Sequence, residues 1–252
     1  MPVFKIKKVW DYCTYNKSFF LFVLILFAIV NFIEQLYDND IYSDVLFFIF
    51  IISIIALYGY GLTITRDRAN KGVRLPKIMP KEIFSLGIKS FIVMGVYIVI
   101  QGVLLTLVCS PFGFPAFDLE EMLFHFQETL HLLYIHDPFE TLIFLVLGAI
   151  FFFITLFFME IALARLADTG KLLSSFDLIS IKRTIDVVGW RHYAKDCTLI
   201  IIAMVILSLI KAYTIPVDFL DYIVDIILGL LIFATQYLGI GAIYSEFKEK
   251  TE

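Results

Sequence analysis

The chain has 252 residues, of which 60% are apolar, 17% aromatic and 17% charged, and its mean hydropathy is +0.90. An ordinary soluble domain is about 45 to 50% apolar and about 25% charged, so this composition excludes a soluble globular protein. The formal net charge of −4 excludes a basic protein that binds nucleic acid.

Six apolar runs are long enough, or nearly so, to cross a bilayer core about 30 Å thick as helices. In chain order they are residues 19–33, 45–64, 86–108, 139–164, 198–215 and 220–244. The first run is short and no small-x-small cleavage site follows it, so we interpret it as a retained helix and not as a signal peptide. All seven prolines fall outside the runs, which predicts unbroken helices.

Basic and acidic residues alternate in the connections between these runs. The connections before the first, third and fifth runs, together with the C-terminal tail, hold 18 of the 20 Lys and Arg residues, whereas residues 34–44 and 109–138 hold none. Lys and Arg mark the cytoplasmic side of a membrane protein. The sequence therefore predicts an all-α integral membrane protein of the cell (plasma) membrane. We expect six transmembrane helices in three antiparallel hairpins, a single domain over residues 1–252 and both termini in the cytoplasm.

Small residues lie near the end of each even-numbered run. Examples are Gly59 and Gly61 in the second run and Gly239 and Gly241 in the sixth. Small residues let the backbones of membrane helices approach closely. We expect helix contacts at these positions.

Each odd-numbered run follows a basic, partly amphipathic segment on the predicted inner side: residues 4–17, 79–86 and 178–196. Basic residues at the inner leaflet attract anionic headgroups by about 1 kcal/mol each. The residues predicted to contact lipid headgroups are Lys182, Arg183, Arg191 and Lys195. The segment at 178–196 is either a lipid-sensing or partner-docking element or an anchor that only fixes the topology.

Residues 117–134, on the predicted outer side, form an amphipathic pattern with an acidic and histidine-bearing polar face. The residues of that face that could bind a metal ion are Glu121, His125, Glu128 and His131. Imidazole and carboxylate groups are suitable ligands for Zn²⁺. A metal site is one interpretation of this face, and a solvated amphipathic helix on the outer leaflet is the other.

A few charged residues lie inside the runs, where an ionised side chain costs about 3 kcal/mol at the bilayer centre. Lys89 and Glu160 lie near the inner ends of their runs, and Lys211 and Asp225 lie near the outer ends. Because consecutive helices are antiparallel, the members of each pair have similar depth. We predict structural ion pairs between Lys89 and Glu160 and between Lys211 and Asp225, or its neighbour Asp221. A substrate or proton site is the alternative.

The sequence contains no recognisable catalytic motif. It lacks the His-Glu-x-x-His, Gly-x-Ser-x-Gly, phosphate-loop and Cys-x-x-Cys patterns. We therefore predict no enzyme activity and no cofactor, and expect a protein that associates with the bilayer, with anionic lipids or with other membrane proteins. The alternatives are a transporter or channel for a small or amphipathic solute, and an outer-face metalloenzyme.

Three motifs carry a family resemblance. They are Gly59-Tyr60-Gly61 leading to Arg66 and Leu75-Pro76, the segment Arg165-Leu166-Ala167-Asp168-Thr169-Gly170, and Phe176-Asp177 before a basic amphipathic helix. In these the chain resembles the archaeal and bacterial membrane proteins grouped as domain of unknown function 4013. It is more distantly similar to the membrane domain of some glycerophosphodiester phosphodiesterases. The resemblance implies a fold built from helical hairpins and implies no active-site residues.

Overall fold

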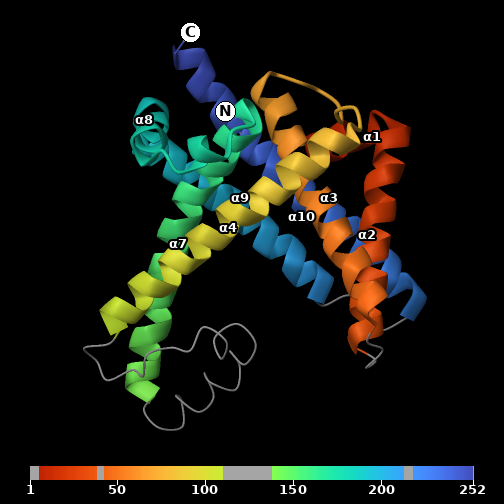
Figure 1. Cartoon of the computed structure of the whole chain (residues 1–252), viewed down its shortest axis with the longest axis horizontal. Coiled ribbons are helices and arrows are strands. Elements are labelled where there is room, and N and C mark those ends of the chain that lie inside the picture. The colour runs from red at the N-terminus through yellow and green to blue at the C-terminus, as the bar shows by residue number, and fades with distance from the viewer. Residues whose placement is uncertain (1–5, 39–42, 110–137, 213–217, 252) are drawn as a thin grey trace. The chain divides into compact units, whose positions relative to one another are not determined.

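The computed structural model describes residues 6–38, 43–109, 138–212 and 218–251, and these residues contain helices and no strands (Figure 1). The helices are α1 (Ile6–Thr14), α2 (Lys17–Asp38), α3 (Asp44–Ala69), α4 (Pro80–Cys109), α7 (Pro138–Thr169), the 3₁₀ helix η2 (Leu172–Ser175), α8 (Leu178–Val188), α9 (Trp190–Ala212) and α10 (Asp218–Thr251). A backbone in lipid must form all its hydrogen bonds internally, which is why the apolar runs are helical. The predicted all-α class is confirmed.

Five described helices are long and apolar enough to cross a membrane: α3, α4, α7, α9 and α10. Helices α1 and α2 form a pair that is bent by 104° and would supply a sixth span if the two are counted together. The short first apolar run, residues 19–33, lies within α2. Because of the sharp bend, α1 does not extend this helix in a straight line. The six-span hairpin layout remains a prediction.

The chain divides into two compact units. Unit 1 comprises Met1–Phe91 and Glu160–Glu252, and unit 2 comprises Ile92–Met159. Both boundaries between them fall inside continuous helices, α4 and α7. The single domain expected from the sequence therefore stays a prediction.

Helix α10 is the centre of unit 1. It packs against α1, α2, α3, α8 and α9, and Leu230, Ala234, Tyr237 and Tyr244 along it are buried. Its 34 residues rise about 51 Å at about 1.5 Å per residue, which exceeds a bilayer core of about 30 Å. The sequence predicts that the charged residues after residue 244 form a C-terminal tail. In the structure they form the last turns of α10.

Glycines let α3 pack closely against two neighbouring helices, without side chains between the backbones at the contact points. A Cβ atom at Gly59 would overlap the backbone of Ile83 on α4, and one at Gly61 would overlap the ring of Tyr237 on α10. A Cβ atom at Gly241 on α10 would lie 2.7 Å from a backbone oxygen of α3. The close contacts expected from the small residues at Gly59, Gly61 and Gly241 are confirmed.

The amphipathic segments expected before the odd-numbered runs differ from one another. Helix α1 is separate, with Val9, Tyr12 and Cys13 buried at helical spacing, but residues 79–86 mostly form the first turns of α4. The segment 178–196 is broken at Gly189, whose φ of 99° is a left-handed conformation that favours glycine. Because the chain turns there, α9 begins at Trp190 and not at residue 198.

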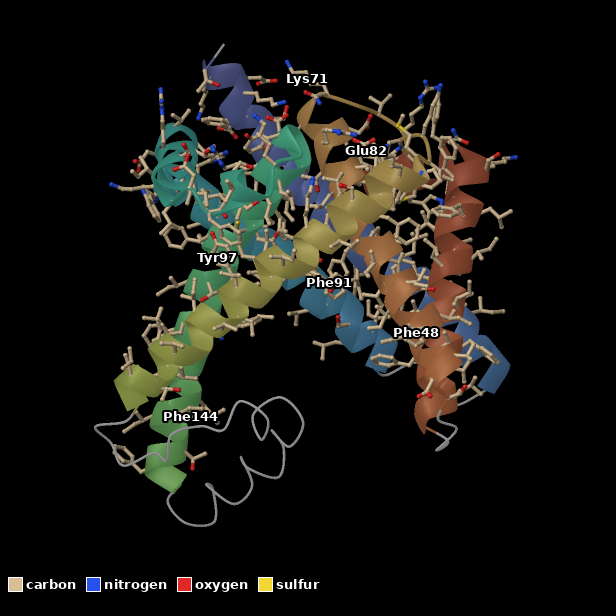
Figure 2. All side chains as sticks on the ribbon, in the orientation of Figure 1. Phe48, Lys71, Glu82, Phe91, Tyr97 and Phe144 are labelled. Carbon is tan, nitrogen blue, oxygen red and sulfur yellow. The ribbon has the colours of Figure 1, made fainter. Side chains whose placement is uncertain are left out.

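Unit 2 consists of the parts of α4 and α7 within residues 92–159. Its buried large side chains include Val93, Tyr97, Leu105, Phe144 and Phe157, and Figure 2 labels Tyr97 and Phe144. Many apolar side chains of the unit are exposed, among them Ile98, Val103, Leu107, Leu142, Ile150 and Phe152. Such a surface suits hydrocarbon as its solvent.

Candidate functional site

Charged side chains gather at one end of unit 1, which we call the basic end. It comprises α1, residues 66–82, residues 165–196 and residues 244–251. Figure 2 shows Lys71 and Glu82 at this end, where nitrogen and oxygen atoms are concentrated, and Phe48 towards the opposite end of unit 1. The basic end is therefore the part of unit 1 in which charged groups are close enough together to form a site.

Ion pairs join the last turns of α10 to the other elements of the basic end. The Lys248 ammonium contacts the Asp168 carboxylate at the end of α7, and Lys71 Nζ lies 2.9 Å from Glu249 Oε1. The Lys248 and Asp168 side chains are each about three-quarters buried. These pairs fix the end of α10, so the charges of this helix serve the packing of unit 1.

Arg165, from the motif at 165–170, holds the segment that leads into α8. Its Nε donates a hydrogen bond to Ser174 O over 3.1 Å, and its guanidinium lies 3.7 Å from Asp177 Oδ2. Asp177 is the N-cap of α8, where its Oδ1 accepts a hydrogen bond of 3.0 Å from Ser180 N. The hydrogen bond from Ser180 lowers the pKa of Asp177 from its ordinary value of 3.8, and the Arg165 charge acts in the same direction.

Gly170 ends the same motif and terminates α7. Its φ of 67° is left-handed, and its N–H donates to Leu166 O over 2.8 Å, as in a common helix C-terminus. Lys89 Nζ on α4 donates to Gly170 O over 2.7 Å. The motif residues Arg165 and Gly170 therefore have structural roles.

The predicted ion pair between Lys89 and Glu160 is not formed. Lys89 donates to Gly170 O instead, because the carbonyl groups at the end of α7 have no helical partner and carry partial negative charge. Glu160 Oε1 accepts a hydrogen bond of 3.2 Å from Gln236 Nε2. Among the described residues, the two predicted partners thus bind other groups.

The second predicted ion pair and the predicted outer metal site are not tested by the structure. Asp225 lies on α10, but the side chains of Lys211 and Asp221 lie outside the described part, so the second ion pair stays a prediction. The outer residues Glu121, His125, Glu128 and His131 also lie outside the described residues.

The four basic residues predicted to contact headgroups are exposed. Lys182, Arg183, Arg191 and Lys195 lie on the surface of α8 and the start of α9. None of them forms an ion pair with a residue that the structure describes. Together with three exposed apolar residues we call them the α8 surface: Leu173 (82% exposed), Leu178 (60%) and Ile179 (83%).

The apolar face of α8 is mostly used inside the protein. Ile181, Ile185 and Val188 are buried, and α8 packs against α9 and α10. The apolar part of the α8 surface is therefore confined to Leu178 and its neighbours at the start of the helix.

A pocket of about 1040 Å³ opens at the basic end between α1, the end of α3, the start of α9 and the end of α10. Its lining includes Tyr12, Arg68, Lys71, His192, Asp196 and Glu246. Within it, His192 Nε2 lies 3.1 Å from Glu246 Oε2 and 3.4 Å from Asp196 Oδ2, and the three ligand atoms lie within 4.8 Å of one another. Imidazole and carboxylate groups in this arrangement could hold a metal ion.

Sequence reasoning missed this cluster. His192 and Asp196 are four residues apart on α9, which places them on one helix face and was a detectable signal. Glu246 lies on α10, far along the chain. Only the packing of α10 against α9 brings the third residue to the other two.

The comparisons with known proteins give one family. No curated protein and no solved structure matches the chain, so the more distant resemblance to the glycerophosphodiester phosphodiesterase domain stays a prediction. The family model described as Protein of unknown function (DUF4013) matches residues 45–244. This span includes all three motifs and most of the chain, and the chain therefore belongs to the DUF4013 family of uncharacterised multi-pass membrane proteins.

Proposed function

We propose that this protein is a non-enzymatic membrane protein that binds anionic lipid headgroups at the cytoplasmic face of the cell membrane through the α8 surface. One observation carries the proposal: four exposed basic side chains without an ion pair in the described part of the chain lie on α8 and the start of α9, and exposed apolar side chains lie on η2 and the first turn of α8. Of the other basic residues at the basic end, Lys71 and Lys248 are paired with carboxylates, whereas Lys7, Arg74, Lys77 and Lys81 are exposed and form no ion pair with a described residue. The charges of the α8 surface are available for a partner outside the protein.

The composition of the α8 surface fits the boundary between lipid headgroups and acyl chains. Lys and Arg near an anionic leaflet contribute about 1 kcal/mol each. Leu178 and Ile179 would be costly in water, whereas their insertion below the headgroups removes apolar area from water at about 25 cal/mol per Å². Charge and apolar insertion together are the two contributions that hold a surface helix to a membrane.

The proposal places both termini in the cytoplasm, as the sorting of basic residues supports. A C-terminal fusion to green fluorescent protein should be fluorescent, and the same fusion to alkaline phosphatase should be inactive, because phosphatase is active only outside the cytoplasm. If the green fluorescent protein fusion is not fluorescent and the alkaline phosphatase fusion is active, the basic end lies outside the cytoplasm and the proposal is contradicted.

Lipid binding can be measured by native mass spectrometry of the delipidated full-length protein titrated with phosphatidylglycerol or phosphatidylcholine. The test variant replaces the four basic residues of the α8 surface with Gln. The matched control replaces four other exposed basic residues of the chain, Lys7, Arg74, Lys77 and Lys81.

The wild-type protein should prefer phosphatidylglycerol. The test variant should lose at least about tenfold in affinity for it, since each lost charge is worth up to about 1 kcal/mol, and the control should lose much less. No preference for the anionic lipid, or equal losses in both variants, would show that the α8 surface is not the binding site.

A further inference from the structure

We propose that His192, Asp196 and Glu246 form a binding site for a divalent transition metal ion of the zinc class, at the wall of the pocket of the basic end. The site goes beyond the lipid-binding function and uses none of its residues. The three side chains come from α9 and α10, the helices that pack against each other at the centre of unit 1.

The distances fit three ligands of one ion. Ligand atoms on a tetrahedral ion with bonds of about 2.1 Å lie about 3.4 Å from one another. His192 Nε2 lies 3.1 Å from Glu246 Oε2 and 3.4 Å from Asp196 Oδ2. The 3.1 Å contact is a hydrogen bond between the His192 and Glu246 side chains, which an ion shared by the two side chains would replace.

The buried carboxylate of Asp196 is the second observation that points to a cation. Asp196 is 4% exposed and lies on the wall of the pocket. Apart from His192, a member of the cluster, it has no hydrogen-bond or ion-pair partner in the described part of the chain. A buried carboxylate is stable only with a positive partner, and a bound metal ion would supply that charge.

A neighbouring lysine fixes the orientation of the third ligand. Lys250 Nζ lies 2.7 Å from Glu246 Oε1 and donates to Val188 O over 3.2 Å. The other oxygen, Oε2, is the one that faces His192. Hydrogen bonds from outside the ligand set that hold a carboxylate in this way are typical of metal sites.

The donor set selects the class of metal. One imidazole and two carboxylates, without a thiolate, suit Zn²⁺ and similar divalent ions and do not suit Cu(I). Three protein ligands leave a fourth position for water on the side of the pocket.

The test measures zinc binding to the purified full-length protein in detergent, after chelator treatment, by isothermal titration and elemental analysis. We expect one Zn²⁺ per chain and a rise in the thermal unfolding midpoint on loading. His192→Gln, Asp196→Asn and Glu246→Gln should each lower the affinity at least tenfold. The matched control Glu249→Gln changes a carboxylate of the same pocket outside the cluster and should bind zinc as the wild-type protein does.

A variant of the outer segment, His125→Ala with His131→Ala, separates this site from the one that the sequence suggested. Zinc binding should persist in it. If the wild-type protein binds no zinc, if the three cluster variants bind it unchanged, or if the outer variant abolishes binding, the proposal is overturned.

A second measurement needs no variant and so does not depend on variant folding. Diethylpyrocarbonate modifies accessible histidines, and the His192 side chain is 41% exposed. Mass spectrometry of the labelled wild-type protein should show that Zn²⁺ protects His192. Labelling of His192 that is equal with and without Zn²⁺ would also overturn the proposal.

Discussion

The packed helices of unit 1 and the helices of unit 2 use glycine in opposite ways. In unit 1, a Cβ atom at Gly59, Gly61 or Gly241 would overlap a neighbouring helix, whereas in unit 2 a Cβ atom at Gly95 or Gly148 would meet nothing within 4 Å. In lipid, apolar side chains gain little by leaving the solvent, so specific helix contacts depend on close packing and polar interactions. The described contacts of both kinds are concentrated in unit 1.

The polar groups follow the same division. Unit 1 carries the ion pairs of Lys71, Lys248 and Lys250 and the histidine cluster. The described surface of unit 2 is covered by exposed apolar side chains such as Val103 and Phe152. Unit 1 therefore holds the candidate site, and unit 2 presents a surface suited to lipid.

The largest difference is expected from one substitution made in both units. Gly59→Ala should lower the free energy of unfolding by about 3 kcal/mol, because the new methyl group meets the backbone of α4, which cannot rotate away. Gly95→Ala should change it by less than about 1 kcal/mol, since its surroundings are open. Thermal unfolding in detergent measures both, and equal midpoints would contradict the division.

A second test uses two phenylalanines of unit 2. Phe144 is 3% exposed and Phe152 is 53% exposed. Phe144→Ala should cost about 3 kcal/mol through lost packing, whereas Phe152→Ala should cost less than about 0.5 kcal/mol because its contacts are with solvent or lipid. A cost for Phe152→Ala as large as that for Phe144→Ala would show that the exposed side of unit 2 is covered by protein.

The ion pair of Lys248 tests the polar side of the comparison. Lys248→Met should lower stability by about 1 to 2 kcal/mol, because it leaves the mostly buried Asp168 carboxylate without its cation. Asp168→Asn in the same chain should cost much less than it does alone, which a double-mutant cycle of unfolding midpoints can measure. Additive losses would mean that the two side chains do not stabilise each other.

The smallest effect concerns the pH dependence of α8. The folded-state pKa of Asp177 is below its ordinary value of 3.8, so its contribution to the helix is fully present above about pH 4. That contribution is lost as the pH falls through the lowered pKa. Hydrogen exchange of the first turn of α8, corrected for the intrinsic rate, should show a loss of protection at low pH.

The control for this prediction is Asp177→Asn, since Asn caps a helix about as well as Asp but does not titrate. Its protection should be independent of pH across the same range. The same acid-induced loss in the variant would assign the effect to another group.

Sequence reasoning was accurate for the helices and less accurate for their ends. Apolar runs identify spans because a chain in lipid must be helical, but a charged segment can be either a connection or the end of a long helix. Residues 245–251 of α10 and 190–197 of α9 were of the second kind. Gly189 marked the real boundary, and its role followed from its φ and not from its identity alone.

The candidate site shows the same limit at the level of side chains. Similar depth in the membrane suggested that Lys89 pairs with Glu160, yet Lys89 binds the carbonyl group of Gly170 at the end of α7. Depth does not specify the direction in which a side chain points around its helix. For the same reason, the sequence could indicate His192 and Asp196 as a pair on α9 but could not identify Glu246.

By itself, the sequence determined that lipid is the solvent of the apolar runs, that the fold is helical and that basic and acidic segments are separated. Hydropathy and charge can be read along the chain without knowing which residues are in contact. Tertiary structure alone decided which helix is central and which cations are paired. It also brought the histidine of α9 to the carboxylate of α10. Those outcomes depend on how the helices cross and how each is rotated about its axis. Close contacts at a few glycines set this geometry, and the local sequence does not encode it.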